Sequence, residues 1–182
     1  MKIQVDKDTS LEMLQVIHAE SLFNLVDANR DHLRTWLPWV DQMKTVANFR
    51  HHIIETNKRA ADRTDFGYAI VIDRNIVGRM GLHNINHHNR IGEIGYWLAA
   101  DMQGKGIVSR CCTTLITHGF TVLGLNRIEI KCGTGNLKSK CIPEKLGFKQ
   151  EGILRQAEWL NGSFIDLYLF SMLKEEWLNR KL

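Results

Sequence analysis

Two glutamates stand in apolar stretches of the sequence, where a carboxylate is costly unless it has a partner or a task. Glu93 is the only charged residue between positions 91 and 99, and Glu158 lies between Ala157 and Trp159. Loss of water raises the pKa of a carboxyl group and makes its ionised form a stronger base. Both residues are therefore candidate general bases. The alternatives are a Glu93 that binds nearby backbone and a Glu158 that faces solvent on an edge strand.

The turn at residues 103–108 has the composition of a phosphate-binding loop. It carries Gly104 and Gly106, follows an apolar run at 91–99, and precedes apolar residues spaced three to four apart at 107–123. This order predicts a strand, a short turn and an amphipathic helix. Glycines let the backbone amides converge at the helix N-terminus, where an anion is favoured. No Gly-Lys-Ser/Thr of a Walker loop is present, and Ser109 replaces the third glycine of a dinucleotide turn. We interpret the turn as a pyrophosphate cradle.

The rest of the chain alternates between helix-like and strand-like segments, without a repeat or a linker. The doublet at 161–162, Asn-Gly, predicts a tight hairpin between the last two strands, and Asp-Arg-Asn at 73–75 predicts another. The expected strands lie within residues 1–15 and at 66–72, 76–83, 91–99, 127–132, 148–160 and 164–173, and the expected helices at 17–28, 46–61, 107–123 and 139–146.

Several stretches together carry a likeness to a known family over nearly the whole chain. Gln103 and Gly106 fit the pattern Gln/Arg-x-x-Gly-x-Gly/Ala, while Val108 departs from its last position. Glu-Ile-Gly-Tyr-Trp-Leu at 93–98, Lys-Leu-Gly-Phe at 145–148 and Arg-Gln-Ala-Glu-Trp-Leu-Asn at 155–161 add to it. The sequence resembles the GNAT acetyltransferases, most closely the branch that acetylates the N-terminal amine of ribosomal proteins. The resemblance implies one α+β domain over residues 1–182, with a three-layer α/β arrangement in which helices cover both faces of a mixed, mostly antiparallel sheet.

The resemblance also implies that acetyl-CoA is the cosubstrate. Its pyrophosphate would lie on the turn, and an amide near Leu98 would hold the oxyanion of the tetrahedral intermediate. Asn136 resembles the family asparagine that binds the pantetheine arm, although a residue beside Gly135 also suits a plain turn. Val108 would hinder the phosphates if its side chain faced them, and would be harmless in the core. The expected coenzyme-binding residues are Trp97, Leu98, Ala99, Gln103, Gly104, Lys105, Gly106, Ile107, Val108, Asn136 and Ser139.

Amide formation from a thioester needs a base for the amine and an acid for the departing thiolate. Relatives with the same stretch around Glu158 place the base there, and the wider family often uses an acid on the strand of Glu93 through water. Many members use a tyrosine as the acid, but Pro143 takes that position here. Ser139 is the nearest hydroxyl and the expected substitute, and it also suits a helix N-cap. Unaided departure is a further alternative, because a thiol pKa of about 8.5 makes the thiolate a fair leaving group.

Composition limits the classes of function. The 182 residues carry a net charge of +4 with scattered basic residues, which favours a phosphate ligand over nucleic acid. The four cysteines lack metal-ligand spacing and fit the core of a protein in a reducing cytoplasm, and the histidine pairs at 51–52 and 87–88 fit the surface. We therefore expect no metal. The sequence has no apolar run long enough to span a membrane.

These patterns lead to one favoured function and two alternatives. We predict a cytoplasmic N-acetyltransferase that moves an acetyl group from acetyl-CoA to a primary amine by direct attack in a ternary complex. The favoured acceptor is a protein N-terminus of the ribosomal type. A small-molecule amine, such as a polyamine, aminoglycoside or amino acid, is the first alternative. A non-catalytic acyl-CoA-binding module is the second, because Pro143 and Val108 depart from the family pattern. Close relatives often form homodimers, and the apolar last strand would allow one.

Overall fold

A mixed eight-stranded sheet runs through the computed structural model, which describes residues 1–180. The strand order is β1-β2-β3-β4-β5-β6-β8-β7, and the β5–β6 pair is the parallel one. All other neighbouring pairs are antiparallel. The strands are β1 Lys2–Gln4, β2 Thr9–Met13, β3 Phe66–Ile72, β4 Asn75–Asn86, β5 Ile91–Leu98, β6 Arg127–Gly133, β7 Lys149–Leu160 and β8 Ser163–Leu173.

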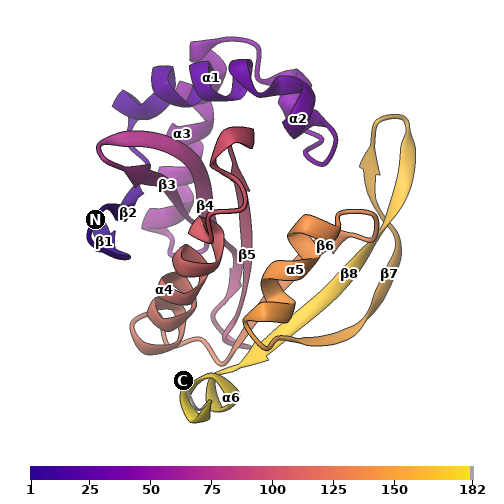
Figure 1. Ribbon diagram of the computed structural model, residues 1–182. Helices are drawn as coiled ribbons and strands as arrows, with labels where there is room; N and C mark the ends of the chain where they lie inside the picture. Colours follow the sequence, from indigo (N-terminus) through magenta and orange to yellow (C-terminus); the bar gives the residue numbers. More distant parts are fainter. Residues whose placement is uncertain (181–182) are drawn as a thin grey trace.

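Helices cover both faces of this sheet (Figure 1). Side chains from α1, α2 and α3 form one core with Ala69, Val71 and Trp97, whereas α4 and α6 belong to the core on the opposite face. Alternation of side chains along a strand explains why neighbours such as Trp97 and Leu98 join different cores. The α-helices are α1 Ala19–Ala28, α2 Arg30–Arg34, α3 Val46–Ala61, α4 Ile107–Thr121, α5 Leu137–Lys145 and α6 Lys174–Asn179, and short 3-10 helices are η1 Val16–His18, η2 Val40–Gln42 and η3 Ala100–Met102.

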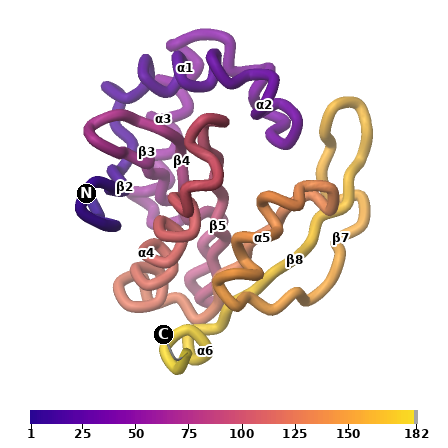
Figure 2. Tube along the Cα trace, in the orientation of Figure 1, coloured from indigo at the N-terminus to yellow at the C-terminus, as the bar shows by residue number. Residues whose placement is uncertain are grey.

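Both predicted hairpins are present. Asn161 and Gly162 have φ angles of 50° and 85°, and Asp73 and Arg74 have φ angles of 47° and 68°. Two consecutive left-handed residues give the twist that matches a two-residue hairpin. Figure 2 shows the longer hairpin, formed by β7 and β8, rising beyond the rest of the sheet toward the level of α2.

The parallel strands β5 and β6 stay together over only part of their length. Their paired residues end at Glu93 and Glu129. Beyond that point β5 continues beside β4 to Leu98, and β6 continues beside β8 to Gly133. The sheet therefore splits, and the two strand ends diverge on either side of a gap.

Several details differ from the sequence-based expectations. The segment at 30–39 contains α2, and a C-terminal helix, α6, follows the last strand. Helix α5 begins at Leu137 and is capped by Asn136, so Ser139 is not its N-cap. Cys141 is exposed and His52 is half-buried, which makes the expected core and surface positions of these two residues wrong. No helix within residues 1–180 is long and apolar enough to cross a membrane.

Candidate active site

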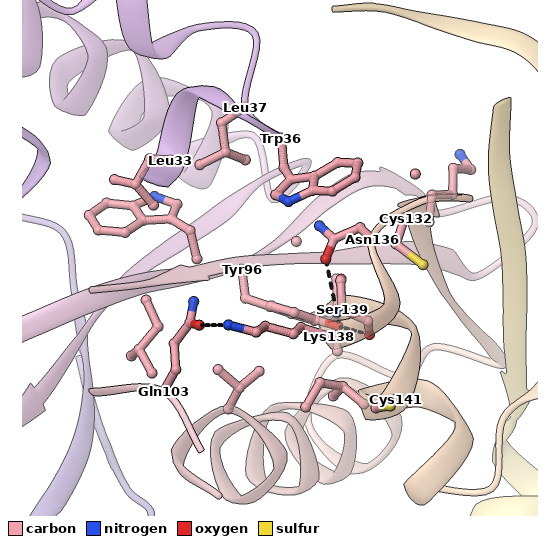
Figure 3. A pocket seen from close by; sticks show the side chains of 18 of the residues that line it. Leu33, Trp36, Leu37, Tyr96, Gln103, Cys132, Asn136, Lys138, Ser139 and Cys141 are labelled. Atoms are coloured by element: carbon pink, nitrogen blue, oxygen red, sulfur yellow. Dashed lines mark hydrogen bonds between the residues drawn. The ribbon is translucent and has the colours of Figure 1, made fainter. Parts of the chain in front are cut away.

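A cleft of about 770 Å³ occupies the gap between the diverging strands. Its walls come from β5, β6, the start of α4, α5, α2 and the β7–β8 hairpin, and Figure 3 shows the side chains that meet there. Of the residues expected to bind or react, only Ala99 and Lys105 do not line it. Those that do are Glu93, Trp97, Leu98, Gln103, Gly104, Gly106, Ile107, Val108, Asn136, Ser139 and Glu158.

The glycine turn presents a cluster of free amides to one end of the cleft. Gly104 and Gly106 have φ angles of 76° and 70°, in the left-handed region that glycine adopts without strain. The first backbone bond of α4 runs from Arg110 N to Gly106 O, at 3.1 Å. The amides of residues 107–109 precede it and have no acceptor inside the helix. Ile107 is buried and anchors the helix start, while Val108 is half-buried at the cleft wall. This geometry suits a pyrophosphate.

A polar bridge spans the cleft above this turn. Gln103 Oε1 accepts from Lys138 Nζ at 3.0 Å (Figure 3), and Gln103 Nε2 lies 2.7 Å from His32 Nε2. The bridge links α2 to α5 and places the Lys138 ammonium group beside Gln103, at the start of the glycine turn. Arg110, by contrast, is bound to Asp6 at 2.8 Å and to the Lys105 carbonyl at 3.0 Å. Lys138 is thus the better-placed cation for an anionic ligand.

The amide of Leu98 faces the gap between the strands. Ala99 N donates to Val77 O on β4 at 2.9 Å. Successive amides of a strand point to opposite edges, so the preceding amide, that of Leu98, points away from β4. On that side β6 has already diverged. The Leu98 N–H is therefore available to a carbonyl oxygen in the cleft, as the sequence analysis expected.

Two carboxylates line the cleft in different electrostatic states. Glu93 forms an ion pair with Lys131 at 2.9 Å, so its charge is balanced locally. Glu158 has no ion-pair partner within the described chain; burial raises its pKa, and the nearby Glu93 charge raises it further. A carboxylate of this kind holds a proton more tightly than usual and is the better general base of the two.

A group of hydroxyls and a thiol lies across the sheet from these acids. Ser139 Oγ is 3.3 Å from Tyr96 Oη, which donates to the Ser139 carbonyl at 3.1 Å. Burial raises the pKa of Tyr96 and brings the pKa of Cys132 to about 11. Tyr96 and Glu93 are an odd number of residues apart on β5, so their side chains point to opposite faces. The cleft thus connects acids on one face with hydroxyls on the other.

The side chain of Asn136 joins this group through its oxygen and leaves its nitrogen free. Its Oδ1 accepts from Ser139 N at 3.1 Å and caps α5 (Figure 3). A side-chain amide has two further donors on its nitrogen, and the residue lines the cleft. Capping and ligand binding are therefore compatible at this position.

Sequence reasoning missed Tyr96, Cys132, His32 and Lys138. Tyr96 lies in the stretch at 93–98, where the sequence pattern assigns roles to its neighbours but none to the tyrosine. Cys132 has the pattern of an ordinary core cysteine. The other two lie on α2 and at the start of α5, far apart in the chain, and meet only through Gln103. No local pattern would reveal such a contact. No group of three or more potential metal ligands occurs in residues 1–180.

Comparison with known proteins places this geometry in a family. The family described as the acetyltransferase (GNAT) domain matches residues 10–149. YdaF of Bacillus subtilis strain 168, whose name assigns it provisionally to the ribosomal N-acetyltransferases, is 35% identical over 98% of both chains. The ribosomal-protein-serine acetyltransferase of Escherichia coli K12 is 31% identical over 93% of this chain and 94% of its own.

Solved structures agree with the sequence comparison. A structure of RimL, a ribosomal-protein α-N-acetyltransferase, in complex with coenzyme A superimposes with a TM-score of 0.93 at 27% identity, covering 97% of this chain and 99% of that one. The expected mixed sheet with helices on both faces is confirmed. The chain belongs to the GNAT superfamily and is an acetyl-CoA-dependent N-acetyltransferase.

Proposed function

We propose that the acceptor is the N-terminal α-amine of a protein, of the kind that ribosomal-protein acetyltransferases modify. Two of the relatives named above carry that activity in their names and align over more than nine-tenths of this chain. The unpaired Glu158 carboxylate is the observation that carries the proposal. An α-amine has a pKa near 7.8, so roughly a tenth of it is unprotonated at neutral pH, against well under about 0.1% for lysine. One modest base is enough for such an acceptor.

The reaction begins with acetyl-CoA in the cleft. Its pyrophosphate lies on the amides of residues 104–109 beside Lys138, and its pantetheine arm follows β5 past Asn136. The thioester carbonyl then meets the Leu98 amide at the gap between the strands. An amide in this position stabilises negative charge on the oxygen as the tetrahedral intermediate forms.

The acceptor approaches from the face that carries the acids. Its amine nitrogen attacks the thioester carbon and Glu158 removes the proton that becomes acidic in this step. Trp36 forms part of the wall on this side and packs against Gly133 and Gly135. Asn161, in the turn of the β7–β8 hairpin, donates to the Arg34 carbonyl of α2 at 3.1 Å. Together they form a mouth that admits an extended chain end.

Collapse of the intermediate breaks the carbon–sulfur bond and releases a thiolate on the opposite face. Ser139 Oγ, which lies beside Tyr96 Oη, gives the sulfur its proton, and solvent water in the cleft returns a proton to Ser139 and takes the one held by Glu158. This division assigns proton removal and proton delivery to different faces of the sheet. Ser139 thereby takes the role that a tyrosine at the position of Pro143 has in many family members, and Pro143 itself does not line the cleft.

Release of coenzyme A across a panel of acceptors tests the proposal. The panel holds a peptide that begins with serine, the same peptide with a blocked N-terminus and a free lysine, a polyamine and an aminoglycoside. We expect turnover with the free N-terminus and at most background with the others. Turnover confined to small amines would replace the proposal with the small-molecule alternative. Absence of turnover despite tight coenzyme A binding would favour the acyl-CoA-binding module.

Three expectations from the sequence stay predictions. They are the cytoplasmic location, the homodimer and the lack of direct nucleic-acid binding. The extension of one domain over residues 1–182 is likewise proposed, and it is supported by the continuous sheet that joins β1 to β7.

A further inference from the structure

A second cavity, of about 150 Å³, lies beside the cleft on the α1–α3 face of the sheet. Apolar side chains, among them Leu22 and Phe49, make most of its wall, and Arg79, His52 and Trp97 supply the polar groups. Trp97 lines both this cavity and the cleft, so the two share one wall.

Each polar residue of this cavity has a side-chain nitrogen without a hydrogen-bond partner. Within residues 1–180, six buried side-chain nitrogen or oxygen atoms have no hydrogen-bond partner. Three of the six are Arg79 Nε, His52 Nε2 and Trp97 Nε1. Buried polar groups are nearly always paired in folded proteins. The gathering of half of the exceptions around one small cavity marks it as a candidate ligand site.

The charge of the cavity wall favours an anionic ligand. Arg79 forms no ion pair within the described residues, because the nearby Asp65 is taken by Arg59 at 2.9 Å and by His83. Burial lowers the pKa of Arg79 to about 10 and that of His52 to about 4. At neutral pH the cavity therefore holds one unpaired cation and a neutral imidazole. Water would satisfy the hydrogen bonds but would leave the charge unbalanced.

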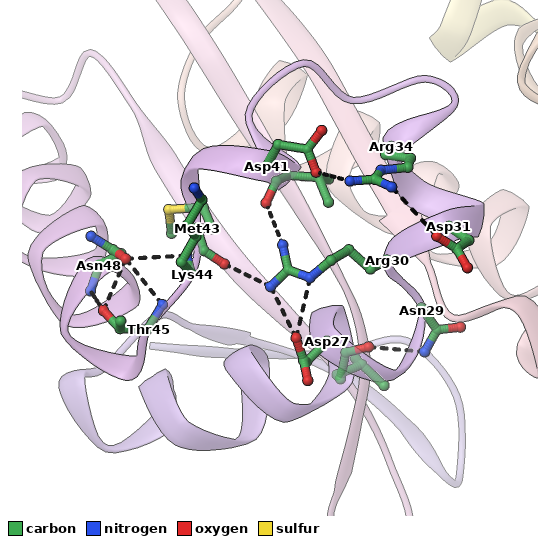
Figure 4. Close-up of polar contacts among 12 residues, drawn as sticks. Asp27, Asn29, Arg30, Asp31, Arg34, Asp41, Met43, Lys44, Thr45 and Asn48 are labelled. Carbon is green, nitrogen blue, oxygen red and sulfur yellow. Dashed lines mark hydrogen bonds and ion pairs between the residues drawn. The ribbon is translucent and has the colours of Figure 1, made fainter. Parts of the chain in front are cut away.

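Part of the cavity wall is fixed by hydrogen bonds. Met43 and Trp39 belong to this part and lie in the segment between α2 and α3. Arg30 holds this segment by donating to the Val40 carbonyl at 2.7 Å and to the Met43 carbonyl at 3.0 Å (Figure 4). The cavity wall thus rests on specific bonds and is prepared for a small occupant.

We propose that this cavity binds a short-chain monocarboxylate, with the carboxylate on Arg79 and Trp97 and the alkyl chain between Leu22 and Phe49. A guanidinium group binds a carboxylate through paired hydrogen bonds, and the apolar wall suits an alkyl chain. The volume equals about five water molecules, which limits the chain to about two to four carbon atoms. Sulfate or phosphate would leave the apolar wall unmatched and carry more charge than one cation balances.

Tryptophan fluorescence provides a direct test, because Trp39 and Trp97 both line the cavity. Propionate is titrated at constant ionic strength, with propionamide as the uncharged analogue and with chloride and sulfate as plain anions. We expect a saturable change with propionate, and affinity at least about tenfold weaker for propionamide. No saturable change, as for a cavity that holds only water, would overturn the proposal. Equal affinity for propionamide or for the plain anions would overturn it too.

Variants locate the binding. Arg79→Met removes the cation and should abolish the propionate response, whereas Arg50→Met removes an exposed charge of α3 that does not line the cavity and should retain it. Leu22→Phe fills the cavity and should also abolish the response, which covers the case that Arg79→Met does not fold. Acetyl-CoA affinity, measured on each variant by calorimetry, serves as the folding control. A full response in either Arg79→Met or Leu22→Phe would place the binding elsewhere.

Discussion

At the scale of single residues, the two acids of the cleft differ in whether they have an ion-pair partner. Glu93 is paired with Lys131, while Glu158 is left with a raised pKa in the cleft. The same sequence argument applied to both, since each stood alone among apolar neighbours. The ion pair joins strands that are 38 residues apart in the chain, and only the fold reveals it.

Glu158→Gln should lower kcat by about 10²-fold, the usual worth of a general base. In the wild type, kcat/KM should fall as pH drops through the pKa of Glu158, which lies above the ordinary value of a glutamate. Steady-state rates across the pH range measure both effects. Glu93→Gln is the matched control: it should keep the acidic limb but move it to lower pH, because the Glu93 charge no longer raises the pKa of Glu158. An acidic limb that survives in Glu158→Gln and disappears in Glu93→Gln would reverse the assignment.

The same substitution should stabilise the protein. The pKa of Glu158 is higher in the folded protein than in the unfolded chain. The folded protein therefore binds this proton more tightly, and ionisation of Glu158 disfavours the folded state. Stability contributed by this group is therefore lost as pH rises through the folded pKa. Glu158→Gln should raise the urea midpoint at pH 7 and change it little at pH 4. A lower midpoint at pH 7 would mean that Glu158 is stabilised by contacts other than those described.

Tyr96→Phe tests whether Tyr96 positions Ser139. Loss of the hydroxyl removes the bond to Ser139, and we expect kcat to fall by about two- to tenfold with the KM for acetyl-CoA unchanged. Tyr68→Phe is the control, because Tyr68 is buried in the core with an unpartnered hydroxyl. An equal loss of kcat in both variants would argue for a general effect on the fold.

At the scale of elements, the start of α4 is where local sequence determines function most directly. Gly104 and Gly106 were expected to shape the turn, and their φ angles agree with that expectation. Placement of α5 was less predictable. Because Asn136 caps it, the helix begins at Leu137, two residues before the expected start at residue 139. Pro143 is tolerated inside the helix.

Gly106→Val should abolish coenzyme A binding, because it adds a side chain at the amide cluster and strains a left-handed residue. Gly124→Val is the matched control: Gly124 also has a positive φ, of 71°, but an added Cβ there meets nothing within 4 Å. Each variant should lose about 1–3 kcal/mol of stability from backbone strain. Calorimetry with coenzyme A then separates them, and intact binding in Gly106→Val would mean that the pyrophosphate lies elsewhere.

Arg30→Ala should loosen the segment between α2 and α3. Its bonds to two backbone carbonyls are charge-assisted, and their loss should cost about 2 kcal/mol (Figure 4). Arg34→Ala breaks exposed ion pairs with Asp31 and Asp41 and should cost much less. Urea unfolding measures both variants. Equal losses would show that the backbone bonds of Arg30 add nothing beyond surface pairing.

At the scale of the whole molecule, the order and type of most elements could be predicted, since apolar spacing and turn residues are local. The sheet order could be expected only through the family likeness. Helices α2 and α6 were missed because five and six residues are too few for a periodic pattern. The second cavity was also unpredictable. It depends on side chains from α1, α3, β4 and β5 that meet only in the folded chain.

In the half of the sheet formed by β6, β8 and β7, a charged network adds to the backbone pairing of the strands. Arg127 on β6 binds Glu151 on β7 at 2.7 and 2.6 Å, and Ser171 on β8 donates to Glu151 at 2.6 Å. These bonds lower the pKa of Glu151 to about 2. Because the folded pKa is depressed, the stability they contribute is present above the unfolded pKa and is lost as pH falls through about 2.

Acid unfolding tests this arrangement. Glu151→Gln should reduce the free energy of unfolding at pH 7 and flatten its decline between about pH 4.5 and pH 2. Glu55→Gln, which removes an exposed pair with Lys58 on α3, should leave the curve nearly unchanged. Parallel curves for the wild type and Glu151→Gln would show that backbone pairing and packing join these strands without a contribution from the Arg127–Glu151 pair.

The position of the acetyl group on a single peptide tests the central claim most directly. A peptide that begins with serine and contains one lysine offers both amines to the enzyme at equal concentration, and tandem mass spectrometry of the product identifies the acetylated nitrogen. We predict acetylation of the α-nitrogen alone, because Glu158 suits an amine of low pKa and the cleft mouth suits a chain end. Acetylation of the lysine, with the α-nitrogen left free, would contradict the account.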